Sequence, residues 1–265
     1  ILGSEGAGII ESVGSDVTGL AVGDRVGYTL ANGAYATHRV IDAGYVVKLP
    51  DDIHSDLAAS IMLKGLTVAY LIHDSYAVKP GDKVLFHAAA GGVGQIFAQW
   101  ANSIGAKVIG TVGSDEKIQI AKDNGYAHVI NYSKQDFSKE VMKITENKGV
   151  PAVFDGVGKK TFQGSIACLK IRGMMVSFGN ASGPLDPINV PKEIQPKGLY
   201  LTRPSIGQYF TNREELQAGA NEIFEKVKFG KIKIKIFKKY KLADAKQAHA
   251  DLEARKLTGP AILIP

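Results

Sequence analysis

The sequence predicts an α/β protein built on a doubly wound parallel sheet, together with a smaller β-rich part. Apolar strand-like segments alternate with helical patterns from about residue 83 to about residue 202. The first of these strands passes into its helix through a glycine-rich turn, and short β segments open the chain. Regular alternation of apolar strands and helices is typical of a parallel sheet that helices cover on both faces.

The chain opens with short β segments. Glycine alternates with apolar residues over 2–13, a turn leads into a strand over 19–28, and a further strand is expected over 40–49. A proline and two aspartates end that strand, and a helix is expected over 55–73. These strands are too few for a complete domain, so we expect residues 1–63 to be the remainder of a β-rich domain.

The first strand, turn and helix of the alternating region lie over 83–105. Val84–Phe86 is typical of a buried strand, residues 88–94 form a tight turn, and apolar residues recur every four positions from Ile96 to Ile104. The first N–H groups of a helix have no intrahelical partner and lie at the positive end of its dipole. The turn therefore predicts a binding site for phosphate.

The glycines of this turn fit a dinucleotide-binding fingerprint of the form A-x-G-x-x-G. Gly91 and Gly92 allow the backbone to approach a pyrophosphate, and Gly94 allows the helix to pack closely on the strand. Ala89 stands where the fingerprint usually begins with glycine. The strand before the turn and the helix after it supply the context that the motif requires. The pattern favours dinucleotide binding over the alternative, a tight turn that holds no ligand.

The alternation continues to residue 203, and the pattern changes after Pro204. A tail of helix, lysine-rich strand, helix and strand then resembles a return to the β-rich part, so we expect domains over 1–63, 64–203 and 204–265. The strands expected in the alternating region are 107–112, 128–130, 152–155, 174–178 and 199–202, with helices at 115–124, 137–145 and 160–169; those of the tail are helices 214–227 and 244–254 and strands 231–237 and 261–264.

The composition is that of an ordinary globular protein. The chain has 265 residues, 45% of them hydrophobic, and no apolar run long enough to span a membrane. Its start lacks the basic flank of a signal peptide. One cysteine, Cys168, excludes an internal disulfide and a cysteine-based zinc site. We expect a cytoplasmic protein without a membrane partner.

The net charge of +6 is concentrated in a lysine-rich stretch from Lys226 to Lys241. Lysine alternates with isoleucine over 231–237, which predicts a strand with one solvated face, its lysines discouraging edge-to-edge pairing. The alternative is a nucleic-acid surface. Few aromatic residues are interleaved for base stacking, so the solvated strand is favoured.

The end of the second strand indicates which nucleotide is bound. Folds that bind NAD usually place an acid there for the ribose hydroxyls, whereas this chain has Gly113 followed by Ser114. Those two residues leave room for a 2′-phosphate, and Lys117 adds positive charge. Asp115 lies in the first helical turn, where the helix dipole favours acids. The pattern favours NADPH; an inward-facing Asp115 would favour NADH.

Several short motifs are distributed along nearly the whole chain: KGLTV at 64–68, HAAAGGVG at 87–94, GTVGSDEK at 110–117, VINY at 129–132, VFDGVG at 153–158, VSFGN at 176–180 and TRPS at 202–205. Together they resemble those of the zinc-free, zeta-crystallin-like quinone oxidoreductases, a branch of the medium-chain dehydrogenases/reductases. The resemblance implies a Rossmann domain joined to a GroES-like catalytic domain, and NADPH-dependent reduction of a small quinone by a homodimer.

The resemblance also implies a set of cofactor-binding residues. One group would lie on the pyrophosphate, a second around the 2′-phosphate, and a third beside the nicotinamide. In that order the groups are Gly91, Gly92 and Val93; Gly113, Ser114, Lys117, Tyr132 and Arg255; and Thr67, Phe178, Gly179 and Asn180.

Four of these residues have alternative structural roles. The Tyr132 ring could cap the sheet edge, and Arg255 could be solvated near a helix C-terminus. Thr67 could close a helical turn, and Phe178 could belong to the core.

No metal is expected. Zinc-dependent relatives carry a histidine in a GHE motif, where this chain has Ser4 in the sequence Gly-Ser-Glu. Glu5 is then expected to be a structural acid or a hinge residue. The six histidines are scattered, and His87, at the end of the central strand, is expected to be a packed residue rather than a base.

The family's catalytic domain begins upstream of Ile1, so we expect a shortened chain that binds cofactor but reduces quinones poorly. No residue is assigned as catalytic; Arg203 and Asn180 are candidates on the substrate side. Two alternative functions remain: an NADPH-dependent enone or alkenal reductase, and an RNA-binding protein of the zeta-crystallin type.

Overall fold

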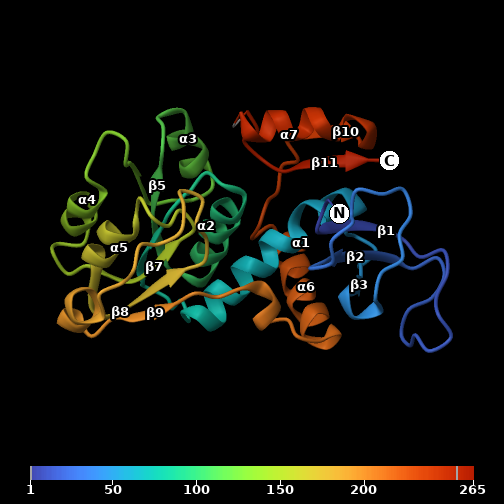
Figure 1. Cartoon of the computed structure of the whole chain (residues 1–265), viewed down its shortest axis with the longest axis horizontal. Coiled ribbons are helices and arrows are strands. Elements are labelled where there is room, and N and C mark those ends of the chain that lie inside the picture. The colour runs from blue at the N-terminus through green and yellow to red at the C-terminus, as the bar shows by residue number, and fades with distance from the viewer. Residues whose placement is uncertain (1, 255) are drawn as a thin grey trace. The chain divides into compact units, whose positions relative to one another are not determined.

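The computed structural model describes residues 2–254 and 256–265. The chain divides into two compact units: the first combines the residues up to Ala69 with Ile206–Pro265, and the second is Tyr70–Ser205. Figure 1 shows the elements of both units. The divisions fall within six residues of the domain boundaries expected at 63/64 and 203/204. As boundaries of functional domains, these stay predictions.

The second unit is built on a six-stranded parallel sheet with the order β6-β5-β4-β7-β8-β9. The chain enters at β4, extends outward through β5 and β6, and then returns to the other side of β4 to form β7, β8 and β9. The direction of winding therefore reverses between β4 and β7, which confirms the doubly wound α/β class. The strands are β4 (Lys83–Phe86), β5 (Lys107–Val112), β6 (His128–Asn131), β7 (Val150–Asp155), β8 (Leu169–Ser177) and β9 (Tyr200–Thr202).

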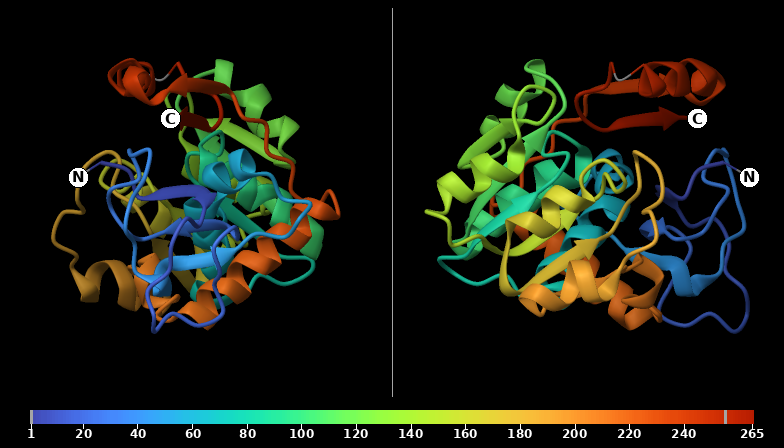
Figure 2. Two further views of the ribbon diagram at one scale, coloured as in Figure 1. Left: turned by 90° about the vertical axis from the view of Figure 1, so that its right-hand side faces the viewer. Right: turned by 60° about the vertical axis from the view of Figure 1, so that its left-hand side comes forward.

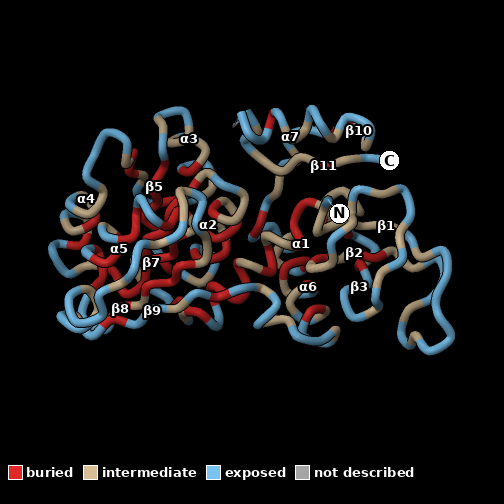
Figure 3. The backbone as a smooth tube through the Cα atoms, in the orientation of Figure 1, coloured by how far each residue is buried: buried red, intermediate tan, exposed pale blue. Residues whose placement is uncertain are grey.

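Helices pack on both faces of this sheet (Figure 2). On one face, Phe97 of α2 stacks against Phe86 and Phe154, with ring centroids 4.5 and 4.6 Å apart. On the other face, Val141 of α4 and Phe162 of α5 join a cluster of buried strand residues. The buried residues follow the strands in Figure 3. The helices are α2 (Gly92–Ile104), α3 (Glu116–Asp123), α4 (Phe137–Ile144) and α5 (Phe162–Cys168).

Cys168, the last residue of α5, is fully buried as a free thiol. Burial raises the pKa of this thiol to about 12. The side chain therefore packs as a small apolar group, as the sequence predicts.

The first unit contains an antiparallel sheet of order β1-β2-β3 and a parallel pair, β10 and β11. Two long helices pack together beside the first sheet: a Cβ on Gly65 of α1 would lie 2.9 Å from the Ile223 side chain of α6, which would have to move to admit a larger residue. The elements are β1 (Glu5–Ile9), β2 (Arg25–Thr29), β3 (Val46–Lys48), α1 (Ser55–Tyr70), α6 (Arg213–Lys228), β10 (Lys238–Lys241), α7 (Ala245–Glu253) and β11 (Ala261–Ile264).

Two strands expected in the first unit are wrong, one in its extent and one in its existence. The strand predicted over 40–49 is limited to Val46–Lys48, because the Asp42 carboxylate accepts a hydrogen bond from Gly44 N at 2.8 Å and starts a short 3-10 turn. The lysine strand predicted over 231–237 does not form. Its isoleucines are buried or half-buried and its lysines exposed, as the alternation implies. In the described part of the chain these residues belong to no strand; the Phe237 N–H donates to the Pro260 carbonyl at 2.7 Å, and the ladder with β11 begins at Lys238.

The helix that begins at Ser55 continues as a π-helical turn, Leu71–Ser75. By length and composition alone, Ser55–Ser75 could cross a membrane, and it is the one such stretch among the described residues. In its most apolar window, 61% of the residues are buried within the protein, as in the core helix of a globular protein.

Candidate cofactor site

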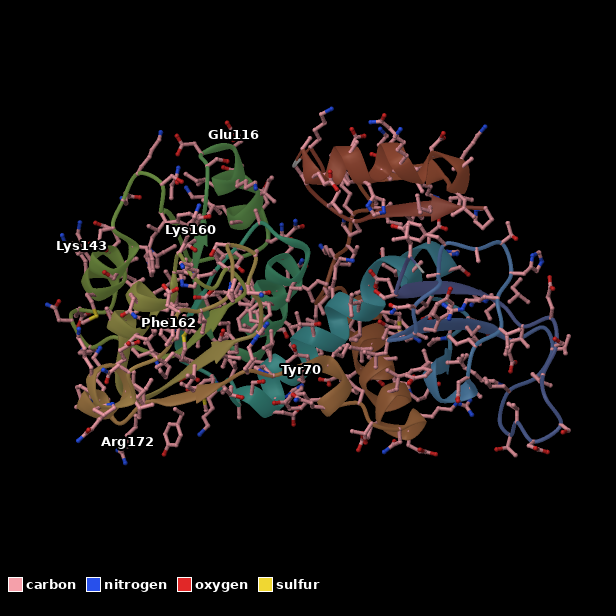
Figure 4. The ribbon with its side chains drawn as sticks, in the orientation of Figure 1. Tyr70, Glu116, Lys143, Lys160, Phe162 and Arg172 are labelled. Carbon is pink, nitrogen blue, oxygen red and sulfur yellow. The ribbon has the colours of Figure 1, made fainter. Side chains whose placement is uncertain are left out.

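The predicted cofactor-binding residues of the second unit lie in loops at one edge of its sheet. Parallel strands end at the same edge, so Tyr132 after β6, Gly113 after β5, the glycine turn after β4 and Phe178 after β8 form one row. Glu116, which starts α3, and Arg172 of β8 lie at opposite ends of this unit (Figure 4). The row crosses the point where the winding reverses, which is where such sheets bind nucleotides.

The glycine turn is held by backbone contacts. Ala88 has a φ of +58°, and its carbonyl accepts the Gly91 N–H at 2.8 Å. A Cβ on Gly94 would lie 2.7 Å from the carbonyl oxygens of Ala88 and Ala89. Glycine is therefore required at position 94 for α2 to start so close to the strand, as predicted.

Helix α2 presents an open N-terminus above the turn. Gly91 is its N-cap residue and has no side chain to cap the helix. In the described part of the chain, the N–H groups of Gly92 and Val93 have no hydrogen-bond partner. Unpaired amides at the positive end of a 13-residue helix are suited to bind a phosphate group.

Gly113, at the end of β5, lies beside the Tyr132 hydroxyl and is followed in the chain by Ser114 and Lys117. A Cβ on Gly113 would lie 2.9 Å from the Tyr132 hydroxyl oxygen, so glycine leaves this space open. Ser114, Lys117 and Tyr132 are half-buried, and within the described residues their polar ends make no hydrogen bond or ion pair. Two hydroxyls and one ammonium are suitable donors for a phosphate ester.

The loops after β7 and β8 pack directly on each other. A Cβ on Gly179 would lie 2.5 Å from the Gly156 carbonyl oxygen, and the Phe178 ring covers Gly156. Phe178 also contacts Phe86, with ring centroids 5.5 Å apart, and remains half-buried rather than part of the core. Asn180 is exposed beside them.

A buried polar network lies beneath these loops. The two ring nitrogens of His87 are 2.7 Å from the Thr111 hydroxyl and 2.9 Å from the Ser165 hydroxyl. Ser165 in turn donates to the Asp155 carboxylate at 3.1 Å. Burial lowers the pKa of His87, while the charge of Asp155 opposes this effect. His87 is thus a packed strand-end residue, and its burial keeps it from acting as a solvent-exposed base.

The Asp155 carboxylate also holds the loop after β7. It accepts the N–H groups of Val157 at 2.8 Å and Gly158 at 3.0 Å, and the Thr161 hydroxyl at 2.8 Å. The network was not predicted from the sequence. An aspartate that ends an apolar strand and is followed by Gly-x-Gly was the available signal, because such an acid can accept several backbone N–H bonds.

Two further predicted residues make structural contacts. Thr67 is in α1 of the first unit, where its hydroxyl donates to the Leu63 carbonyl at 2.8 Å and closes a helical turn. Arg203 donates to the Ser177 carbonyl at 2.8 Å, which ties the end of β9 to β8. Arg255 lies outside the described residues. The functional roles expected for all three stay predictions.

Glu5 is a structural acid, which is one of the two roles expected for it; the other was a hinge residue. Its carboxylate accepts the Leu63 N–H and the Lys64 ammonium, each at 2.8 Å, and so links β1 to α1. Among the described residues, no group of three or more His, Cys, Asp or Glu side chains could hold a metal ion.

The lysine-rich stretch is partly neutralised within the first unit. Lys228 pairs with Asp52 at 3.1 Å, and Lys239 pairs with Asp56. Lys238 lies 3.4 Å from Asp251. Pairing with acids reduces the positive potential that a nucleic-acid surface needs.

The fold and the site define a dehydrogenase or reductase with a dinucleotide-binding unit. Two family models match: "Alcohol dehydrogenase GroES-like domain" over residues 1–51 and "Zinc-binding dehydrogenase" over residues 92–226. Among curated proteins, a quinone oxidoreductase of Pseudomonas aeruginosa is 46% identical over 265 residues, which cover all of this chain and 82% of the relative. A 2-haloacrylate reductase of Burkholderia is 43% identical over 269 residues, covering all of this chain and 81% of that protein.

Solved structures give the same result. A quinone oxidoreductase of Escherichia coli in complex with NADPH is 46% identical, with a TM-score of 0.96, and the match covers all of this chain and 82% of that one. The chain belongs to the quinone oxidoreductase branch of the medium-chain dehydrogenases/reductases. The predicted resemblance is therefore confirmed.

Proposed function

We propose that this protein is an NADPH:quinone oxidoreductase that works without a metal. The main support is the combination of family and site: relatives at 46–48% identity are quinone oxidoreductases, and the sheet edge carries an open helix N-terminus beside unengaged donors. An enone or alkenal reductase is the less favoured alternative.

The cofactor lies across the row of strand-end loops. Gly91, Gly92 and Val93 bind the diphosphate through backbone N–H groups. Gly113 leaves space for the 2′-phosphate, which Ser114, Lys117 and Tyr132 bind. The loop formed by Phe178, Gly179 and Asn180 borders the nicotinamide.

The bound cofactor supplies the reducing electrons, and the protein supplies position and electrostatic field. Phe178 and the loop after β7 present an apolar surface beside the nicotinamide position, suited to a flat ring. Asn180 and Arg203 are candidate donors on the substrate side. The reduced quinone is a weak base, so water is a sufficient proton source and no dedicated acid is needed.

We also propose a cytoplasmic homodimer. Within the described residues, the edge strand β9 pairs only with β8, and its residues Tyr200 and Leu201 are 57% and 38% exposed. A second copy that pairs at this edge would cover them. Replacement of Tyr200 by Lys should shift the protein to monomer in sedimentation velocity, whereas an unchanged sedimentation coefficient would place any interface elsewhere.

The activity is tested by steady-state oxidation of NADPH with ortho-quinones, para-quinones and enones. Lys117→Ala should raise the KM for NADPH on the order of tenfold, because it removes a charge-assisted bond to the phosphate. Lys122→Ala, which removes another lysine from the same helix, is the matched control and should leave the KM unchanged. Turnover with enones but not quinones would favour the alternative reductase.

A further inference from the structure

Asp115 occupies the N-cap position of α3, yet its side chain does not cap that helix. Aspartate is among the best N-cap residues, because its carboxylate accepts backbone N–H bonds. In this chain one carboxylate oxygen accepts the Asn131 side-chain amide at 2.7 Å, and the other pairs with the Lys134 ammonium. Asn131 is the last residue of β6 and Lys134 lies in the turn that follows, so the carboxylate is held by the end of the neighbouring strand.

The same turn also holds the backbone of the loop after β5. The Ser133 hydroxyl donates to the Gly113 carbonyl at 2.9 Å. Asn131 is buried, and its side-chain oxygen accepts the Ser133 N–H at 3.0 Å, so it orients both contacts. Tyr132 lies between these anchors. Residues 131–134 therefore bind both ends of the loop 113–115, through the Gly113 carbonyl and the Asp115 carboxylate.

This loop is where the site distinguishes two kinds of nucleotide. A carboxylate free to turn toward the ribose accepts hydrogen bonds from the 2′- and 3′-hydroxyls and repels a 2′-phosphate. Ion pairing and hydrogen bonding hold Asp115 in its charged form, with its pKa below the ordinary value. The carboxylate is therefore negatively charged. How strongly it repels a 2′-phosphate depends on its distance from the ribose.

We propose that Asn131 and Lys134 form a specificity latch, which withholds the Asp115 carboxylate from the ribose and so makes the site selective for a 2′-phosphorylated nucleotide. The latch rests on the proposed function, because it assumes that a nicotinamide dinucleotide binds at this edge. Lys134 and Asn131 act as positioning residues. The phosphate itself is bound by Ser114, Lys117 and Tyr132.

The latch is tested by the dissociation constants of NADPH and NADH for Lys134→Met, Asp115→Asn and the double variant. Lys134→Met should weaken NADPH binding on the order of fivefold, because the Asp115 carboxylate then loses its ion pair, is held by the Asn131 amide alone, and repels the phosphate. NADH should bind as tightly as before or more tightly. In the Asp115→Asn background, the same lysine change should alter NADPH binding by less than about twofold, since no carboxylate remains to be released.

Lys148→Met is the matched control. It also removes an exposed lysine from an ion pair of the same unit, with Glu146 at 2.8 Å, but at the start of β7 and so at the other edge of the sheet. It should change neither constant. Exposed ion pairs add little to stability, so all variants should fold.

Two results would overturn the latch. One is an equal loss of NADPH affinity on removal of Lys134 with and without Asp115, which would make Lys134 a direct phosphate ligand. The other is a parallel loss for NADPH and NADH, which would make the turn only structural. Wild-type protein that binds neither nucleotide would instead refute the proposed function itself.

Discussion

At the scale of single residues, the site depends on two glycines, because a side chain at either position would fill space that the fold or the nucleotide needs. Glycine at 94 allows the helix to approach the strand, and glycine at 113 leaves open the space below the Tyr132 hydroxyl. Within the described residues, the Tyr132 hydroxyl beside that space makes no hydrogen bond. Side-chain size at a few positions therefore decides whether a nucleotide fits.

Gly113→Ala should weaken NADPH binding on the order of tenfold. The new methyl group would lie 2.9 Å from the Tyr132 hydroxyl oxygen and must displace it. Because Tyr132 is also a proposed phosphate ligand, the glycine change is compared in two backgrounds: Gly113→Ala should cost less affinity in Tyr132→Phe, which lacks the clashing oxygen, than in the wild type. Fluorescence titration measures all four proteins; an equal cost in both backgrounds would show that the methyl group does not act through the Tyr132 hydroxyl.

His87 should make stability depend on pH. Burial lowers the pKa of His87 below the unfolded value of 6.5, so the unfolded chain binds the extra proton first. The stability contributed by the neutral ring is complete above pH 6.5 and is lost as the pH falls below that value toward the folded pKa. Urea unfolding at about pH 7.5 and about pH 5 should show a smaller decline for His87→Gln than for wild type. Equal declines would contradict this expectation.

At the scale of elements, β4, the glycine turn and α2 form one rigid strand–turn–helix unit. Tyr126, which precedes β6, donates from its hydroxyl to the Gly94 carbonyl at 2.8 Å. Its ring also packs where a Cβ on Gly110 would stand, 2.5 Å away. The start of α2 is thus tied to the sheet through both a hydrogen bond and close packing.

Gly94→Ala should disrupt this strand–turn–helix unit. The added Cβ would lie 2.7 Å from two backbone carbonyl oxygens, which cannot move without shifting β4 or α2. We expect loss of NADPH binding and a destabilisation of about 2 kcal/mol. Gly81→Ala serves as a comparison, since a Cβ there meets nothing within 4 Å and only its φ of +84° is unfavourable. Comparable nucleotide binding in both variants would disprove the close-approach argument.

The alternation of strands and helices could be predicted because each buried strand is apolar on both faces. The bounds of Lys107–Val112 and Ala261–Ile264 agree with the prediction. The prediction missed the first half of β8, where Lys170, Ile171 and Arg172 are exposed and hide the strand pattern. It also placed a strand over 231–237, because alternation shows which side chains face inward but not whether a partner strand exists.

Those parts of the candidate site that consist of short sequence motifs could be predicted. The glycine turn and the residues after β5 could be found because strand ends share one edge. The hydrogen bonds of His87 with Thr111 and Ser165 join residues 24 and 78 positions apart in the chain, and no local pattern indicates them. The same holds for the contact between Asn131 and Asp115.

At the scale of the whole molecule, ligand binding and stability are linked through the second unit. Its core contains Trp100, the chain's one tryptophan, which is fully buried. The nucleotide binds the folded unit and not the unfolded chain. At a free concentration of about one hundred times Kd, NADP⁺ should raise the free energy of unfolding by about 2.7 kcal/mol.

Urea unfolding followed by Trp100 fluorescence measures this effect. NADP⁺ is preferred to NADPH because it does not absorb the tryptophan emission. AMP at the same concentration is the control and should give a much smaller shift. A midpoint that does not respond to NADP⁺ would show that the second unit alone does not determine binding.

The labelling rate of Cys168 would measure how often the second unit opens. Its thiol is the chain's one cysteine, is covered completely, and has its pKa raised to about 12, so alkylating reagents cannot reach or activate it in the native fold. A pulse of maleimide therefore marks only molecules in which α5 has lifted from the sheet, and the labelled mass accumulates at the rate of that opening. Mass spectrometry of one sulfur atom would thus report kinetic stability without any engineered probe.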